Sequence, residues 1–443
     1  MIEIDTRPPA SGSQTPGHWV LPALLLAMVI TGFLSSVEAG AQPSSQAAQP
    51  PPSRHDDVSI CPAPGGRVVE PYRWYPSLDL ARIPFHTAAG PWGPRAAITA
   101  PAPPVTRRSV RVTTASQLAA EALVPGTLIT VDAELIGPTV VLGDVADVDI
   151  VVPPGRSVSQ LTIGRYSPPS TTRRVRIRGT TPGTHSGGRI GRITFFSSPA
   201  ADVIIDGVDL NGEDGKGGNL LWQFANSSER VAIVKIRGHG VGAASLQRAS
   251  KDIVIAGNRI LSGARPREVN GWSEGWGIRG GDRVVVYDNR IEGTRYHSVR
   301  LHPEPGPPQY AWIANNIFVD RHEARILDVF AVGGSSSRYP AVWAVCNRVY
   351  ANSTCMTPSF EAQHANLAVL TFNSFFGSVS ERLQRAKQAA HGTGHDYLSG
   401  NTFSPWREPP AWEAPGDPAA VPLPPAKPDR YNAALKLKPC PPP

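Results

Sequence analysis

Short segments in which β-branched or aromatic residues alternate with polar ones recur from residue 175 to residue 403. The first two are VRIRGT at 175–180 and VIIDGVDL at 203–210, and the last is YLSGNTF at 397–403. Such alternation is typical of β-strands, and the segments return roughly every 28 residues. Because a strand of this kind cannot bury its apolar side alone, we expect successive repeats to stack on one another.

One residue type holds the same position in the later repeats. It is asparagine, at Asn258, Asn289, Asn315, Asn347, Asn373 and Asn401. Asparagine tolerates a left-handed backbone and can hydrogen-bond to an equivalent asparagine stacked on it. The row predicts a bend between two strands in every coil. The sequence therefore predicts an all-β protein, a right-handed parallel β-helix of about 9–11 coils.

A short helix is expected ahead of the first coils. Thr114 is a suitable N-cap for the apolar-periodic segment Ala115 to Leu123, which ends before Pro125 and Gly126. Packed on the open end of the solenoid, this helix would cover a strand edge that otherwise invites aggregation. A second helix is predicted at Ser380 to Ala390.

The rest of the chain divides by composition. An apolar run from Trp19 to Phe33, followed by the small residues 39–41, is typical of a cleaved secretory signal. We therefore expect a secreted, extracellular or periplasmic protein with no stable membrane span after cleavage. The predicted divisions are a signal peptide at 1–41, a Pro/Ser/Gln-rich linker at 42–60, an irregular segment at 61–113, the β-helix with its cap at 114–403 and a proline-rich tail at 404–443.

Composition narrows the classes of partner. The 42 glycines and 46 prolines disfavour a helical protein, and the net charge of +7 is not gathered in runs. Nucleic-acid binding is therefore disfavoured. The small positive net charge is compatible with an acidic polysaccharide as the ligand, but a charge of this size is also explained by solubility alone. We expect a monomer.

The four cysteines are Cys61, Cys346, Cys355 and Cys440. An even number in an oxidising compartment favours disulfides, and three pairings are possible. Cys346 and Cys355 are close enough in sequence to join one loop. No Cys-x-x-Cys pair exists, so a thiolate zinc site is not expected.

Chemistry-bearing residues gather on a second strand in each coil, in EGWGIRG (274–280), YHSVRLH (296–302) and HEARILDVF (322–330). With Ile278, Val299 and Leu327 inward, two outward columns are predicted. They are Arg279, Arg300 and Asp328, and beside them Trp276, His297 and Arg325. Neighbouring strands are ~4.8 Å apart, so this patch would hold one or two sugar units, with Trp272 and Trp276 stacking on them. The alternative is a solvated face with an ordinary surface ion pair.

The stretch SEGWGIRGG, followed by VRLHPEPGPPQYAWIANNIFV, resembles the pectin-lyase-like superfamily, and within it the chondroitinase B and alginate lyase group. The resemblance implies a lyase that removes the C5 proton of a uronic acid, with Ca²⁺ neutralising the adjacent carboxylate. It assigns Glu274 as a metal ligand, Arg279 as the base and Arg300 as the acid or carboxylate clamp. The base in that group is lysine, so His297 and His302 are alternative bases.

Three functions therefore compete. The first is a secreted lyase acting on a uronic-acid polymer by β-elimination. The second is a non-catalytic glycan-binding or surface β-helix. The third is a polygalacturonase-like hydrolase, suggested by Gly238-His239-Gly240 and by the nearby acids Asp206, Asp209 and Asp214.

Overall fold

A computed structural model gives the fold. All described residues belong to the unit Pro52–Pro443, and the other unit, Met1–Pro51, lies outside them. The described residues are 99–165, 169–196, 200–211, 222–224, 228–239, 244–246, 250–261, 274–279, 281–292, 297–303, 310–320, 325–329, 338–339, 341–345, 347–351, 360–361, 365, 368–371, 373–377, 396–397 and 401–409.

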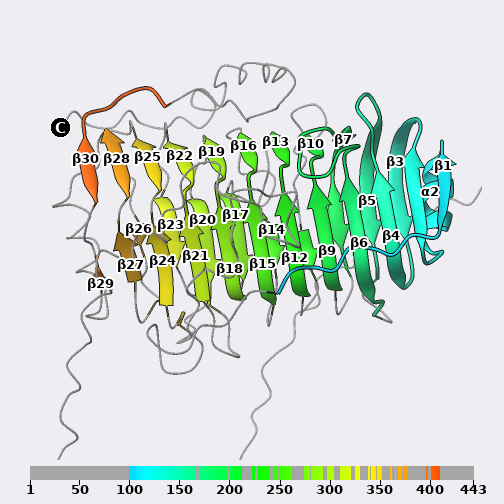
Figure 1. Ribbon diagram of the computed structural model, residues 1–443, viewed down its shortest axis with the longest axis horizontal. Helices are drawn as coiled ribbons and strands as arrows, with labels where there is room; N and C mark the ends of the chain where they lie inside the picture. Colours follow the sequence, from blue (N-terminus) through cyan, green and yellow to red (C-terminus); the bar gives the residue numbers. More distant parts are fainter. Residues whose placement is uncertain are drawn as a thin grey trace, which may run out of the picture. The chain divides into compact units, whose positions relative to one another are not determined.

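Three parallel sheets contain nearly all of the regular structure (Figure 1). The first long sheet contains, in spatial order, β1 (Arg108–Val112), β2 (Thr127–Val131), β4 (Val145–Val151), β6 (Thr172–Arg178), β9 (Ala200–Asp206), β12 (Ser228–Val234), β15 (Lys251–Ala256), β18 (Asp282–Tyr287), β21 (Tyr310–Ala314), β24 (Ala341–Val345), β27 (Ala368–Thr371) and β29 (Asp396–Tyr397).

The second long sheet contains β3 (Glu134–Val141), β5 (Ser157–Ile163), β7 (Arg189–Ile190), β10 (Asp209–Asn211), β13 (Arg237–His239), β16 (Arg259–Leu261), β19 (Arg290–Glu292), β22 (Ile317–Asp320), β25 (Arg348–Ala351), β28 (Ser374–Gly377) and β30 (Thr402–Ser404), with β8 (Ile193–Phe195) pairing with β5 beside this path. The short sheet contains β11 (Trp222–Phe224), β14 (Ala244–Leu246), β17 (Glu274–Arg279), β20 (His297–His302), β23 (Arg325–Val329) and β26 (Phe360–Glu361).

The chain passes from the first long sheet to the second and returns to the first one strand further along. Between β10 and β27 each return passes through a strand of the short sheet. Each strand therefore pairs in parallel with its equivalent in the next coil. Across the described residues this gives eleven coils, one for each strand on the path of the second long sheet. The fold is the predicted right-handed parallel β-helix, with the number of coils at the upper end of the expected range.

Rows of β-branched side chains fill the interior. One row in the first long sheet, with every member 0% exposed, consists of Val148, Val175, Val203, Val231, Ile253 and Val284. Every second residue of a strand points inward, so the row repeats once per coil. The alternation in the sequence reflects this burial.

The predicted capping helix is present as α2 (Ala115–Ala122). Thr114 is its N-cap and accepts a hydrogen bond from the backbone N–H of Gln117 at 3.2 Å, while the Gln117 side chain accepts one from the backbone N–H of Thr114. This is a capping box. Leu118 and Ala122 are fully buried against the coils, so the helix closes one end of the core.

Thr114→Ala is expected to lower the free energy of unfolding by about 1 kcal/mol, because the cap hydrogen bond to the Gln117 N–H is lost. Urea unfolding measures this change. Thr114→Ser, which keeps the hydroxyl, is the control and is expected to stay close to wild type. Equal losses in both variants would contradict the capping role.

The described part of the segment 61–113, residues 99–113, contains one strand that the sequence does not predict. β1 pairs with β2 from Arg108↔Thr127 to Val112↔Val131, so the first long sheet begins before the helix. Most of β1 is exposed, and only Val112 is buried. Only Val110 and Val112 alternate with polar residues in this strand, and two apolar positions are a short signal for a strand.

The asparagine row forms a continuous hydrogen-bonded ladder, but with Asn316 in the place predicted for Asn315. The ladder consists of Asn258, Asn289, Asn316, Asn347, Asn373 and Asn401. Each side-chain N–H donates to the Oδ1 of the next member, at 2.9–3.1 Å. The predicted member Asn315 has the left-handed backbone (φ +57°) instead. The sequence predicts that one asparagine has the left-handed backbone and also stacks. In the structure Asn315 has the left-handed backbone, and Asn316 stacks.

A second row runs along the start of the strands in the first long sheet. One residue per coil is skipped by the strand pairing and has a φ between +51° and +58°: Asp147, Arg174, Asp202, Arg230, Asp252 and Arg283. Acid and base alternate along this bulge row. Such a backbone costs a non-glycine residue about 1–2 kcal/mol, and paired charges offset that cost.

Within the bulge row, an arginine forms a two-point ion pair with the aspartate of the preceding coil. Arg230 donates to both carboxylate oxygens of Asp202 at 2.6 and 3.1 Å, and Arg283 does so to Asp252 at 2.6 and 3.0 Å. Burial acts to raise the pKa of Asp202, but hydrogen bonds from Arg230 and from the Ala102 N–H outweigh it and lower the pKa. The row therefore fixes one face of the first long sheet.

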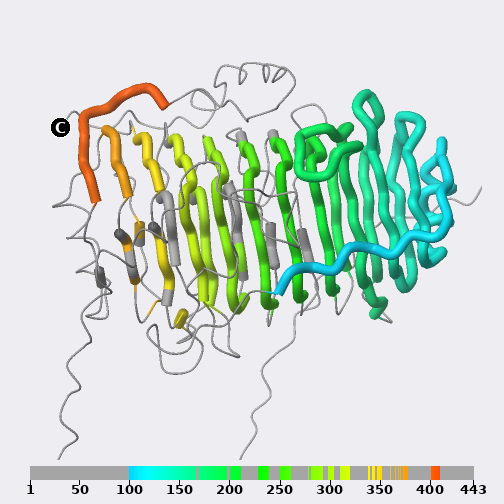
Figure 2. The backbone as a smooth tube through the Cα atoms, in the orientation of Figure 1, coloured from blue at the N-terminus to red at the C-terminus, as the bar shows by residue number. Residues whose placement is uncertain are grey.

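Both ends of the described chain lie along the coils. Residues 99–107 run across the first long sheet (Figure 2), where the N–H groups of Ala102 and Val105 donate to Asp202 and Asp147. At the start of the predicted tail, the Arg407 guanidinium lies 3.9 Å from the centre of the Phe376 ring. These contacts connect several coils at once.

Several predictions lie outside the described residues. They concern the signal peptide, the linker, the disulfide of Cys346 and Cys355, the helix at Ser380 to Ala390 and most of the proline-rich tail. Within the described part of the chain, no helix is long and apolar enough to cross a membrane.

Candidate functional site

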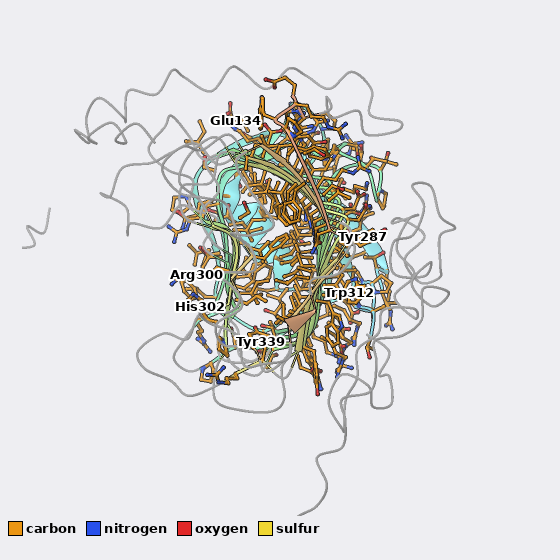
Figure 3. The ribbon with its side chains drawn as sticks, turned by 90° about the vertical axis from the view of Figure 1, so that its left-hand side faces the viewer. Glu134, Tyr287, Arg300, His302, Trp312 and Tyr339 are labelled. Carbon is orange, nitrogen blue, oxygen red and sulfur yellow. The ribbon has the colours of Figure 1, made fainter. Side chains whose placement is uncertain are left out.

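Strand β20 of the short sheet carries both predicted histidines, His297 and His302, and one of the predicted arginines, Arg300. Val299 and Leu301 are 0% exposed and belong to the core. Ser298, Arg300 and His302 alternate with them and so lie on the other face. Arg300 is 6% and His302 is 5% exposed. Figure 3 shows both on one side of the coil, opposite Tyr287 and Trp312 of the first long sheet.

The register between β20 and β23 is the predicted one. Arg300 pairs with Asp328, and His297 pairs with Arg325. An arginine and an aspartate are therefore strand neighbours here, as the sequence predicts. The side chains of His297, Arg325 and Asp328 lie outside the described part, so only their strand positions are established.

The register between β17 and β20 differs from the prediction by two residues. Ile278 pairs with Leu301 rather than with Val299, and Arg279 consequently pairs with His302 rather than with Arg300. The residue in register with Arg300 is Gly277. A shift of two keeps every inward residue inward, so the apolar pattern is compatible with either register.

The same shift changes the neighbours of Trp276 and Glu274. Trp276 pairs with the core residue Val299, so its predicted place beside His297 is wrong, although His297 and Arg325 are in register as predicted. Glu274, the predicted metal ligand, pairs with His297. The side chains of Glu274, Trp276 and Arg279, and the whole of Trp272, lie outside the described residues.

Among the described residues, the strand neighbours of Glu274 supply no further carboxylate for a calcium site. Calcium takes six to eight oxygen ligands, but the register neighbours of Glu274 are His297 and then Arg325. The acidic residues in register with each other, Asp328 and Glu361, lie on β23 and β26. Among the described side chains, no group of three or more His, Cys, Asp or Glu could hold a metal. No chemical step is therefore assigned to an ion.

Two of the acids named for hydrolysis, Asp206 and Asp209, lie on the long sheets and not on the short sheet. Asp206 ends β9 in the first long sheet, and both of its carboxylate oxygens accept from the Gly183 N–H at 2.9 Å. Burial raises the pKa of Asp206 to about 7, against the lowering effects of that bond and of nearby basic residues. Asp209 begins β10 in the second long sheet, in register with Arg189 and Arg237. Asp214 lies outside the described part of the chain.

Comparisons with known proteins add little to this geometry. No protein-family model matches the sequence, and no curated protein matches it significantly. Among solved structures, the chain is similar to a variant of the pectate lyase from Xanthomonas campestris. The TM-score is 0.31 and the sequence identity 12%, over 72% of this chain and 86% of that chain. No residue role is taken from this similarity.

A row of arginines on the second long sheet was not predicted from the sequence. Arg237, Arg259 and Arg290 begin β13, β16 and β19 and are in register with one another. In the sequence, each of these arginines directly follows the residue at the ladder position. That residue is Ile236 in KIRG, Asn258 in GNRI and Asn289 in DNRI. This arginine row is distinct from the face that carries Arg300.

Proposed function

We propose that this protein is a secreted polysaccharide lyase of the pectin-lyase-like kind, which cleaves a uronic-acid polymer by β-elimination at the outer face of β17, β20 and β23. The observation that carries the proposal is the alternation on β20. It places Arg300 and His302 on one face of a strand whose other face is core. The secretory signal predicted at 1–41 favours an extracellular or periplasmic location. The proposal also includes that the protein is a monomer and that it binds acidic polysaccharide but no nucleic acid.

The residue types suit an elimination. Arg300 would bind the uronate carboxylate with its planar guanidinium and so make the C5 proton easier to remove. His302, in its neutral form, would accept that proton, while the bond from C4 to the leaving oxygen breaks and a C4–C5 double bond forms. Arg279, in register with His302, would stabilise the charge that develops on the carboxylate. The leaving oxygen takes a proton from water or from a neighbouring acid.

Burial favours a second candidate, the non-catalytic glycan-binding protein. Ser298, Arg300 and His302 are all less than 7% exposed. A catalytic group must reach its substrate, and side chains this well covered are also typical of a purely structural face. The two candidates differ in whether a bound polymer is cut.

Arg300→Ala is expected to lower the rate of release of unsaturated uronate ends at least a hundredfold, because the carboxylate clamp is lost. The measurement is the absorbance of the new double bond, over a panel of acidic polysaccharides, with and without chelator. Arg348→Ala is the matched control, since Arg348 is exposed on the second long sheet, and it should keep wild-type activity.

Other outcomes contradict the proposal. Retention of a uronate polymer without any cleavage would identify a binding protein. New reducing ends without unsaturation would identify a hydrolase. Loss of activity with chelator would restore the calcium role assigned to Glu274, which the register does not support.

A further inference from the structure

We propose that the segment 61–98 of this chain lies along the outer face of the first long sheet, from β9 to β24, and docks there through apolar contacts. The surface that it would cover is an outer row with one residue on each of six consecutive strands. The outer row consists of Ile204, Ala232, Val254, Val285, Trp312 and Trp343. This face belongs to a different sheet from Arg300, so the proposal does not depend on the lyase activity.

The outer row points away from the interior. Val284 and Val286 belong to the hydrophobic core, and Val285 lies between them. Successive residues of a strand point to opposite faces, so Val285 faces outward. Core residues flank every other member of the outer row in the same way, and no member belongs to the core cluster.

Outward residues on a solvated face would be exposed, but the outer row is buried. Each of its members is 0–5% exposed. The next outward position along the same strands is also apolar and only 0–2% exposed, at Val234, Ala256, Tyr287 and Ala314. Apolar surface that is shielded from water on the outside of a sheet requires another part of the protein to cover it.

The coils before β9 differ in this respect. In register with Ile204 lies Arg176, and in register with Arg176 lies Asp149. The Arg176 guanidinium donates to both carboxylate oxygens of Asp149, at 3.1 and 2.6 Å. The outward position therefore changes from an ion pair to apolar residues at β9, and the apolar cover is needed only from this strand onward.

The described residues 99–107 show where the preceding chain is directed. The Val105 N–H donates to Asp147 of β4, and the Ala102 N–H donates to Asp202 of β9. Followed backwards, the chain crosses two coils in three residues, or ~3.2 Å per residue at ~4.8 Å per coil, which is close to full extension. Figure 2 shows its blue end beyond β9, on the side of β12. The preceding segment thus arrives where the outer row begins.

The length of the segment is sufficient. From β9 to β24 the outer row advances by five coils, a distance of roughly 24 Å. About eight extended residues span this distance, whereas the segment 61–98 is several times longer. It can therefore cover both outward positions of each strand.

The composition of the segment matches the face. It contains the aromatic residues Tyr72, Trp74, Tyr75, Phe85 and Trp92, whereas the preceding stretch 42–60 contains none. Aromatic side chains bury large areas and pair with one another. On the sheet, the rings of Trp312 and Trp343 already lie 5.9 Å apart. The segment 61–98, rather than the stretch 42–60, is therefore the occupant.

The test uses the full chain with a recognition site for a specific protease inserted between Ile98 and Thr99, which is exposed. Cys61→Ser is included so that no disulfide of Cys61 can hold the fragment. After cleavage, the chain with an intact outer row is expected to retain the fragment through size-exclusion chromatography. Val285→Asp places an unpaired charge in the contact and is expected to release the fragment at least tenfold faster.

Ile136→Asp is the matched control, because it puts the same charge on an outward aliphatic residue of β3 that is 81% exposed. It should retain the fragment as the intact outer row does. If Val285→Asp fails to fold, Trp312→Ala removes apolar area without adding a charge and is expected to accelerate release in the same direction.

Three outcomes would overturn the proposal. The first is immediate loss of the fragment from the chain with an intact outer row, with unchanged circular dichroism of the coils. The second is dimerisation of the coils once the fragment has left, which would identify a second copy as the cover. The third is an unchanged release rate in both Val285→Asp and Trp312→Ala. Failure to release unsaturated uronate ends affects only the lyase proposal.

Discussion

Asn316→Ala is expected to lower the free energy of unfolding by about 4 kcal/mol, because several buried polar groups lose their partners at once. The Asn316 amide donates to the Val286 carbonyl at 2.9 Å and to Asn347 Oδ1 at 3.0 Å. Its own Oδ1 accepts from the backbone N–H and the side chain of Asn289, both at 2.9 Å. Alanine leaves these groups buried, and each unsatisfied group costs about 1–3 kcal/mol. Urea unfolding followed by circular dichroism measures the loss.

The matched control is the neighbouring residue. Asn315 has a φ of +57° and lies just outside the ladder. Asn315→Gly places there the residue that tolerates this backbone best, so stability should change by less than about 1 kcal/mol. A larger loss in Asn315→Gly than in Asn316→Ala would return Asn315 to the ladder and contradict the register.

Asp206→Asn is expected to leave stability nearly unchanged at pH 4 and to raise it at pH 8. Burial raises the pKa of Asp206 to about 7 in the folded protein, whereas an unfolded aspartate titrates near 3.9. Between these values the folded state holds a proton that the unfolded state has lost, so wild-type stability falls as pH rises. The fall amounts to about 4 kcal/mol at roughly 1.4 kcal/mol per unit. Asparagine does not titrate and keeps an oxygen for the Gly183 N–H.

Asp149→Asn serves as the contrasting variant. Asp149 is as well buried as Asp206, at 2% exposed, but it pairs with Arg176 at 2.6 Å and with Arg178 at 3.1 Å. Loss of its charge should destabilise the protein at pH 8, opposite in sign to Asp206→Asn. Unfolding free energies measured from pH 4 to pH 8 compare the two. Destabilisation by Asp206→Asn at pH 8 would show that nearby cations stabilise a charged Asp206.

The fold could be predicted because one physical requirement appears in every coil. Each strand must present β-branched residues to the interior, as Val203, Val231 and Ile253 do, and this produces alternation in the sequence. The helix α2 could be predicted equally well, because its cap residue Thr114 and Gln117 are only three residues apart in the sequence. Both features depend on local sequence alone.

Position along the stack was harder to predict. Asn315 and Asn316 are adjacent, and only the backbone shows that the first takes the left-handed conformation while the second stacks. On the short sheet, a shift of two residues exchanges the neighbours of Arg300 without exposing any core residue. The pattern of apolar residues specifies which side a residue faces, but not its partner in the next coil.

The residues of the bulge row are recognisable in the sequence, but they are a whole coil apart from one another. Each member stands directly before an interior valine or isoleucine of its strand, as Asp202 does before Val203 and Arg230 before Val231. The alternation of sign emerges only when strands separated by a whole coil are aligned. Other charged residues adjoin several members, such as Arg173 beside Arg174, and obscure the pattern in a linear reading.

That alternation restricts how the solenoid could have grown. A gene duplication that copied a single coil would bring two aspartates, or two arginines, face to face at a backbone position that is already strained. Copying two coils together preserves the opposition of charges. Along these six coils the repeating unit of charge is therefore a pair of coils, although a single coil is the repeating unit of the backbone.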